Sequence, residues 1–190
     1  AFKITENRIF PLPKCNDFRK LGFVDGGNAP LIKSSDFTIC INRVAGVVVD
    51  KTGTKELQST PHIIEFYSAT VLNSGEDETL EIVTKFFPRE PSFHEYLPER
   101  EIVLNISDPS IRNPSGFLMK IETIAGIARR FAEWTYASKF IENELNEGDI
   151  FVRDCSLQTG FTGETEVAKS FYKTGLTNKI YITGLSKTCR

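Results

Sequence analysis

Two aspartates in this chain occupy positions where a carboxylate can do chemistry. Asp25 ends the apolar run LGFVD and precedes Gly26-Gly27, and Asp154 ends the run IFVRD. Both runs are typical of buried strands, and ligands of α/β sheets gather beyond strand ends, where the backbone opens into a crevice. Carboxylate oxygens suit Mg²⁺ or Mn²⁺, and such ions activate water against phosphodiester bonds. The two aspartates therefore predict a divalent-metal site of the nuclease type.

A third carboxylate is expected from the long amphipathic segment between them. Its candidates are Glu122, Glu133, Glu142 and Glu144. We favour Glu133 because it lies beside the apolar stripe, whereas the last two sit in a polar segment near the expected helix end.

The aspartates and Glu133 can also have a purely structural role instead of binding a metal. An Asp before Gly is more often a turn residue that binds its own backbone, which applies to Asp25. Glu133 can equally form an ion pair with Arg129 or Arg130 on the same helix.

The first half of the chain predicts an antiparallel meander. Runs rich in β-branched and aromatic residues lie between Gly, Pro and Asn signals at Leu21–Asp25, Asp36–Asp50, His62–Leu72 and Thr79–Phe87. The turn residues Asn73-Ser74-Gly75 predict a hairpin between the last two runs. The proline-rich stretch 88–114 predicts an irregular insertion around a short apolar piece at Ile102–Ile106.

In the second half of the chain the spacing of the apolar residues changes. Apolar residues recur at three- and four-residue steps from Phe117 to Leu145, which predicts one long helix. A strand at Ile150–Val152, a helix at Glu164–Tyr172 stopped by Gly175, and a strand at Lys179–Gly184 follow. The expected fold class is α/β, with helices packed on a mixed sheet.

Length, composition and charge set limits on the function. The 190 residues suit a single domain, and 23 Lys and Arg against 25 Asp and Glu argue against coating nucleic acid by bulk charge. The charge balance still allows a local basic groove near the carboxyl end. Aromatic residues are interspersed there with Lys169, Lys173, Lys179, Lys187 and Arg190.

Cysteine usage and hydropathy bear on location. The four cysteines are dispersed without a CxxC pair, so neither a zinc site nor a disulfide framework is indicated. No apolar run approaches the roughly 20 residues needed to span a bilayer, and no secretory signal is visible. We expect a soluble cytoplasmic protein without a membrane association. The missing initiator Met and the end directly after an expected strand suggest a piece of a longer chain.

Four strings in this order, GFVDGGNAPL, ARRFAEWTYASKFIE, NEGDIFVRDCSLQTG and IYITGLSKTCR, resemble the NurA nuclease family. The resemblance is spread over most of the chain and implies an RNase H-like fold for residues 1–190. It implies that Asp25, Glu133 and Asp154 are catalytic ligands of Mn²⁺ or Mg²⁺, and that Lys187 contacts substrate phosphate. Two positions depart from the family pattern: Gly27 replaces a Ser, and Cys155 replaces a Gly.

The resemblance also implies a biological role. The expected activity is 5′-to-3′ exonuclease action on single- and double-stranded DNA in end resection and repair. The expected partners are DNA, a second copy of the chain in a homodimer, and the hexameric helicase-translocase HerA. The alternative is a non-catalytic RNase H-like module that binds nucleic acid or a partner protein, which the two departures and the early end of the chain would favour.

Overall fold

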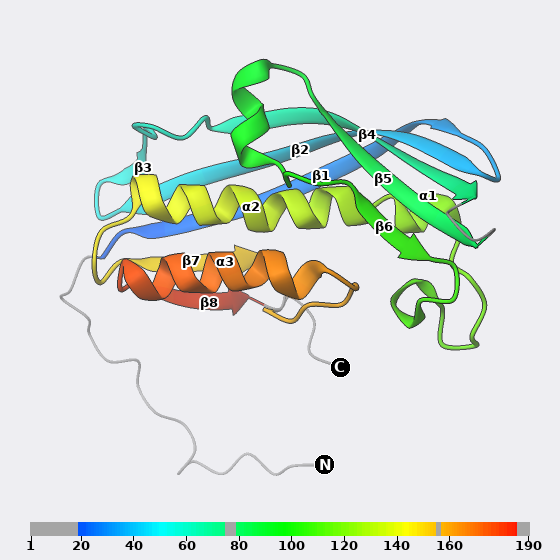
Figure 1. The fold of residues 1–190 in the computed structure, drawn as a ribbon. Helices are drawn as coiled ribbons and strands as arrows, with labels where there is room; N and C mark the ends of the chain where they lie inside the picture. Colours follow the sequence, from blue (N-terminus) through cyan, green and yellow to red (C-terminus); the bar gives the residue numbers. More distant parts are fainter. Residues whose placement is uncertain (1–18, 75–78, 155–156, 186–190) are drawn as a thin grey trace, which may run out of the picture.

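The protein is a mixed α/β fold built on one curled sheet (Figure 1). The computed structural model describes residues 19–74, 79–154 and 157–185. The described strands run in the spatial order β6-β5-β4-β2-β1-β7-β8, and β3 pairs with β2 beside this path. Their bounds are β1 Leu21–Lys33, β2 Phe37–Asp50, β3 Gly53–Lys55, β4 Ile63–Ser74, β5 Leu80–Pro88, β6 Ile102–Asn105, β7 Ile150–Asp154 and β8 Tyr181–Leu185.

The sheet has an antiparallel part and a parallel part. Strand β1 pairs antiparallel with β2, β2 with β4, β4 with β5, and β5 with β6. Strand β7 pairs parallel with β1, and β8 parallel with β7. The predicted meander and the mixed sheet are therefore confirmed. Strand β1 is the boundary, with an antiparallel neighbour on one side and a parallel neighbour on the other.

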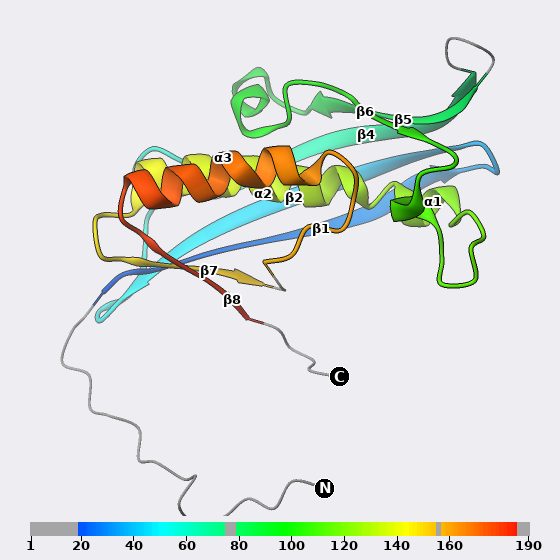
Figure 2. The ribbon, with the colours of Figure 1, turned by 60° about the horizontal axis from the view of Figure 1, so that its bottom comes forward.

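Three helices complete the described fold: α1 Ile121–Ile124, α2 Ile127–Glu144 and α3 Glu164–Thr177. In Figures 1 and 2 the sheet curls around α2, with β5 and β6 on one side of the helix and β7 and β8 on the other. Glycines let α2 approach the sheet closely: a Cβ at Gly22 or Gly46 would lie 2.6 or 2.7 Å from the ring of Phe140. None of the described helices is both long enough and apolar enough to cross a membrane.

Two apolar clusters fill the space between sheet and helices. The larger one lies between α2, α3 and the central strands and contains the buried rings of Phe66, Trp134, Phe140, Phe151 and Phe171. The smaller one lies under β5 and β6 and contains Ile82, Ile102, Leu104, Ile111, Ile124, Ile127 and Phe131. Segment 88–114 therefore contributes to the core.

The segment is more regular than the predicted irregular insertion, and its short apolar piece at Ile102–Ile106 contains a strand of the sheet. It contains two 3₁₀ helices, Pro91–Tyr96 and Pro109–Ile111, around strand β6 at Ile102–Asn105. The proline-rich flanks hide the strand in the sequence because its apolar alternation covers only four residues.

The long helix and its successor also differ from expectation. The predicted helix Phe117–Leu145 begins only at Ile121 and is split at Ala125-Gly126 into α1 and α2. Gly175 does not stop α3, which continues to Thr177. A Cβ at Gly175 would lie 2.4 Å from Cδ1 of Ile182 on β8, so this glycine allows helix and strand to touch.

Candidate active site

Asp25 and Asp154 lie at adjoining positions of neighbouring parallel strands. The β1–β7 ladder ends at the pair Val24–Arg153, and the next residue on each strand is one of the two aspartates. Asp25 is exposed, and its Oδ1 accepts a hydrogen bond of 2.8 Å from the backbone N–H of Gly26. Asp154 is half-buried and ends β7. The two aspartates therefore directly follow the last pair of the β1–β7 ladder, one on each strand.

Asp25 does not end its strand as predicted. Strand β1 continues to Lys33, pairing with β2 along nearly its whole length. The strand tolerates Pro30 because beyond Val24 it has no β7 partner on its other side, and a proline without an N–H is accepted at such an edge.

The two aspartates lie on the sheet face opposite α2. A Cβ on Gly26, the neighbour of Asp25, would lie 2.6 Å from Oε1 of Glu133, so position 26 faces the helix. Arg153, the neighbour of Asp154, is buried against α2 as well. Because successive side chains of a strand point to opposite faces, both aspartates point away from α2.

Glu133 lies on the helix-covered face, held by two arginines. Arg129, one turn earlier on α2, forms an ion pair with Oε1 and also donates to the carbonyl of Gly26 at 3.1 Å. Arg153 donates to Oε2 at 3.4 Å. Burial raises the pKa of Glu133, the two arginines act against it, and Asp25 adds a smaller upward contribution. The alternative of an ion pair with Arg129 is confirmed, but the pair is not solvated as expected, because Glu133 is buried.

A second buried carboxylate supports this arrangement. Glu164, at the start of α3, pairs with Arg130 and accepts hydrogen bonds from Trp134 Nε1 at 2.6 Å and from the N–H of Gly160, also at 2.6 Å. The guanidinium of Arg153 stacks 3.7 Å from the centre of the Trp134 ring. Ion pairs and stacking thus connect α2, β7 and α3 on the helix-covered face of the sheet.

The sequence prediction missed Arg153 and Glu164 as parts of this network. Arg153 offered a usable signal, since it interrupts the apolar run IFVRD at a position that alternation assigns to the same face as Phe151. Glu164 offered none, because its partners are distant in sequence or belong to the backbone.

The described residues do not gather three metal-ligating side chains. Within residues 19–74, 79–154 and 157–185, no group of three or more His, Cys, Asp or Glu side chains could hold a metal ion. The donor set that fits a hard cation is the pair Asp25 and Asp154, whose carboxylates share one face at the end of a ladder. Lys187 and Cys155 lie outside the described residues, so their predicted positions stay predictions.

Of the basic and aromatic residues near the carboxyl end, Lys169 and Tyr172 line a hollow of about 370 Å³, and Lys187 and Arg190 lie outside the described residues. The ring of Phe171 is fully buried in the core, and Lys179 pairs with Glu147 at 2.8 Å. The aromatic side chain there that is most exposed is Tyr181 on β8, with a relative exposure of 59%.

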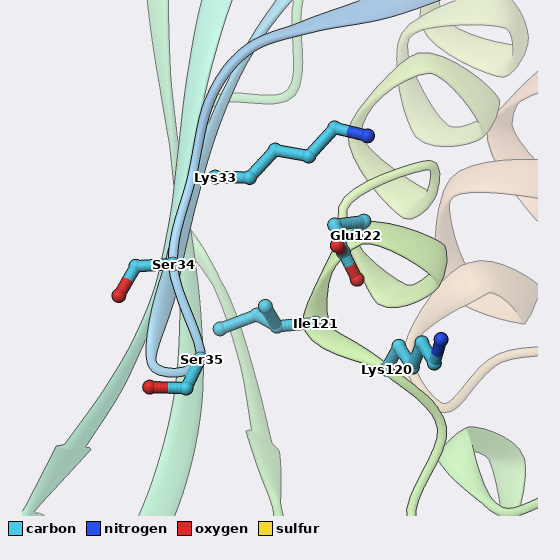
Figure 3. A pocket seen from close by; sticks show the side chains of 6 residues that line it. All are labelled: Lys33, Ser34, Ser35, Lys120, Ile121 and Glu122. Carbon is cyan, nitrogen blue, oxygen red and sulfur yellow. The ribbon is translucent and has the colours of Figure 1, made fainter.

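A hollow of about 410 Å³ lies at the far end of β1, between the turn after this strand and the start of α1. It is lined by Lys33, Ser34, Ser35, Lys120, Ile121 and Glu122. In Figure 3 the side chain of Lys33 extends toward the helices, whereas those of Ser34 and Ser35 point away from α1. The Oγ of Ser34 is bound to Asp36 at 2.5 Å. Lys33, at the end of the strand that carries Asp25, and Lys120, directly before α1, are two cations that can contact an anionic polymer at this end of β1.

Comparison with known proteins assigns no family. No family model, no curated protein and no solved structure matches this chain.

Proposed function

We propose that the chain is an RNase H-like domain that hydrolyses DNA with a divalent metal. The strand order supports this fold: β1 lies between the antiparallel strand β2 and the parallel strand β7, and each of the parallel strands β7 and β8 follows a helix that packs against the sheet. The four sequence strings that resemble the NurA family include β1, α2, β7 and β8, and Asp25, Glu133 and Asp154 lie on the first three of these elements.

The observation that carries the proposal is the adjacency of Asp25 and Asp154. Their carboxylates would hold Mn²⁺ or Mg²⁺, which would supply Lewis-acid stabilisation and an acidified water for phosphodiester hydrolysis. Arg153 and Arg129 hold Glu133 directly behind them. In this arrangement Glu133 fixes the position of β1 relative to β7, and its own contact with the metal, like that of Lys187 with phosphate, stays a prediction.

The substrate and partners follow from the resemblance. DNA would run along β1 toward Lys33 and Lys120, whose ammonium groups would neutralise phosphates. We include in the proposal 5′-to-3′ digestion of single- and double-stranded DNA in end resection, a homodimer, a HerA-type translocase and a cytoplasmic location.

A second candidate function rests on the state of Glu133. A carboxylate that is already paired with two arginines and separated from the aspartates by the sheet leaves two ligands for a metal. This observation favours a non-catalytic RNase H-like module that binds nucleic acid or a protein partner.

Metal titration separates the two candidates. Mn²⁺ is titrated by calorimetry into the 190-residue chain and into the Asp25→Asn and Asp154→Asn variants. The control is Glu56→Gln, at an exposed position on neither of the two strands that carry the aspartates. Labelled single- and double-stranded DNA is incubated with the same samples, with and without a chelator.

The nuclease proposal expects Mn²⁺ binding by the parent chain and by Glu56→Gln, loss of binding in both aspartate variants, and DNA cleavage that the chelator abolishes. Mn²⁺ binding that survives both substitutions would contradict the assigned site. DNA binding without metal and without cleavage would establish the non-catalytic module instead.

A further inference from the structure

A groove of about 780 Å³ lies between strand β6 and helix α3, and neither Asp25 nor Asp154 lines it. Its floor is α2, through Phe131, Thr135 and Ser138. One wall is the segment Glu95–Val103, which leads into β6, and the other is the start of α3 from Thr162 to Ser170. In Figures 1 and 2, β6 and α3 flank α2 on two neighbouring sides. The volume lies in the range typical of ligand sites.

The strand wall carries unpaired backbone groups. Strand β6 is the last strand of the sheet on its side. Ile106 donates to the carbonyl of Leu80 across the antiparallel pair, at 3.1 Å, which fixes the alternation of the ladder. By that alternation the backbone groups of Leu104 and Ile102 face β5, and the N–H and C=O of Val103 point to the open edge.

Apolar side chains contribute to the floor and to both walls of the groove. Leu97 and Phe131 are each 3% exposed and Ile102 is 7% exposed, while Val167 on α3 packs partly buried against the core. An extended chain laid beside β6 would place every second side chain over these groups, because strand side chains alternate between faces.

The rim of the groove is acidic. The lining contains more acidic than basic residues: the glutamates are Glu95, Glu99, Glu101 and Glu166, and the cations are Arg100 and Lys139. Lys85 pairs with Glu101 at 3.3 Å, and Lys139 pairs with Glu142 at 3.8 Å. This balance repels nucleic-acid phosphates and attracts a cationic chain.

We propose that this groove binds an extended basic segment of a partner protein, which adds to β6 as a further strand. Main-chain hydrogen bonds to Val103 fix the segment, apolar side chains at alternate positions contact Phe131 and Val167, and lysine or arginine side chains between them reach Glu99 and Glu166. This is strand addition at a sheet edge, in which backbone pairing supplies affinity and alternate side chains supply selectivity.

The probe is a labelled six-residue peptide of alternating valine and lysine, acetylated and amidated, and its binding to the 190-residue chain is followed by fluorescence anisotropy. The matched probe alternates valine and glutamate. Three variants are compared with the parent chain: Glu99→Lys with Glu166→Lys, Val103→Pro, and Glu56→Lys as a charge control outside the groove. Proline suits position 103 because the N–H it removes points away from β5.

The proposal expects saturable binding of the valine–lysine peptide and much weaker binding of the valine–glutamate peptide. The double charge reversal weakens binding by at least about tenfold, and Val103→Pro weakens it by about fivefold, as the loss of one net hydrogen bond implies. Glu56→Lys leaves binding within about twofold. In the parent chain, the peptide slows hydrogen exchange of the Val103 amide, which tests the pairing even where the proline variant fails to fold.

Three results would overturn the proposal. The first is no binding of the valine–lysine peptide up to about 1 mM. The second is equal binding of both peptides, and the third is an unchanged exchange rate at Val103 in the bound state. Because neither metal nor DNA enters the assay, its outcome is independent of the nuclease proposal.

Discussion

Arg153 donates a hydrogen bond of 3.4 Å to the carboxylate of Glu133, and the next residue on its strand is Asp154. Alternation along β7 places these two neighbours on opposite faces of the sheet. One face therefore carries a closed ion-pair network, and the other carries the carboxylates of Asp25 and Asp154.

The first prediction separates metal ligands from the residue behind them. Asp25→Asn and Asp154→Asn should each weaken Mn²⁺ binding by at least about tenfold, and Glu133→Gln should weaken it less, because it acts through Arg153. Calorimetric titration of the three variants at one pH measures the order. A loss in Glu133→Gln equal to that in the aspartate variants would show that Glu133 is itself a ligand.

The second prediction concerns two adjacent glycines on β1. Gly26→Ala should destabilise the fold by about 1–3 kcal/mol, because the added methyl group would meet Glu133 at 2.6 Å and the backbone carbonyl of Arg43 at 3.1 Å. Gly27→Ala is the matched control, since a Cβ there has no neighbour within 4 Å among the described residues. Its free energy of unfolding should change by less than about 0.5 kcal/mol.

Urea unfolding of both variants measures the difference. Equal stability of the two variants would mean that α2 does not press on β1 at position 26.

The third prediction is an acid-dependent loss of stability from Glu164. Burial acts to raise the pKa of this carboxyl, but the hydrogen bonds from Arg130, from the Gly160 N–H and from Trp134 outweigh burial and lower it. A depressed pKa in the folded state stabilises the fold above the unfolded value of about 4.3, and this contribution is lost as the pH falls through the lower folded pKa. Glu164→Gln should therefore cost about 3 kcal/mol at neutral pH and progressively less below about pH 4.

Chemical denaturation at several pH values tests this prediction. The control is Glu147→Gln, which removes an exposed ion pair with Lys179 whose side chains are 68% and 67% exposed. It should change the free energy of unfolding by less than about 1 kcal/mol at every pH. A constant cost of Glu164→Gln from pH 7 to pH 3 would contradict the assigned cause.

The fourth prediction tests why α3 contains a glycine. Alanine has the better helix propensity, so Gly175→Ala would stabilise an isolated helix by about 1 kcal/mol. Here the methyl group would meet Ile182 Cδ1 at 2.4 Å, and we expect a net destabilisation of about 1–2 kcal/mol. Thermal unfolding measures this change.

A double variant with Ile182→Val removes that Cδ1 atom. It should recover part of the loss, giving a coupling energy of at least about 0.5 kcal/mol. Additive effects of the two substitutions would rule out the contact as the cause.

The sequence was informative where hydrophobic periodicity is long. The meander and α2 were predicted because their alternations extend over nine to eighteen residues, as in β2 with 14 and α2 with 18. Strand β6 was missed because four residues carry too little pattern, and its place in the sheet depends on pairing with β5.

The candidate site was only partly accessible from the sequence. The adjacency of Asp25 and Asp154 follows from the parallel pairing of two recognisable strands. The end of β1 was misplaced because Gly26, Gly27 and Pro30 normally interrupt strands, and only the absence of a β7 partner beyond Val24 explains why they do not. The opposite orientation of Glu133 depends on which face α2 covers, and that is a tertiary property.

The position of β1 between β2 and β7 has a consequence for the order of folding. The meander joins strands that are near in sequence, whereas the backbone of Lys20 reaches Asp149 across 129 residues. Strand pairs that are so far apart in sequence form late in folding, because closing the long loop between them costs entropy before the contact contributes any stability. We therefore expect the half-sheet with Asp25 to form first and Asp154 to arrive only when β7 docks. The two carboxylates would then be brought together in the last stage of folding, and a chain stalled before that stage would have a native-like meander and no metal affinity.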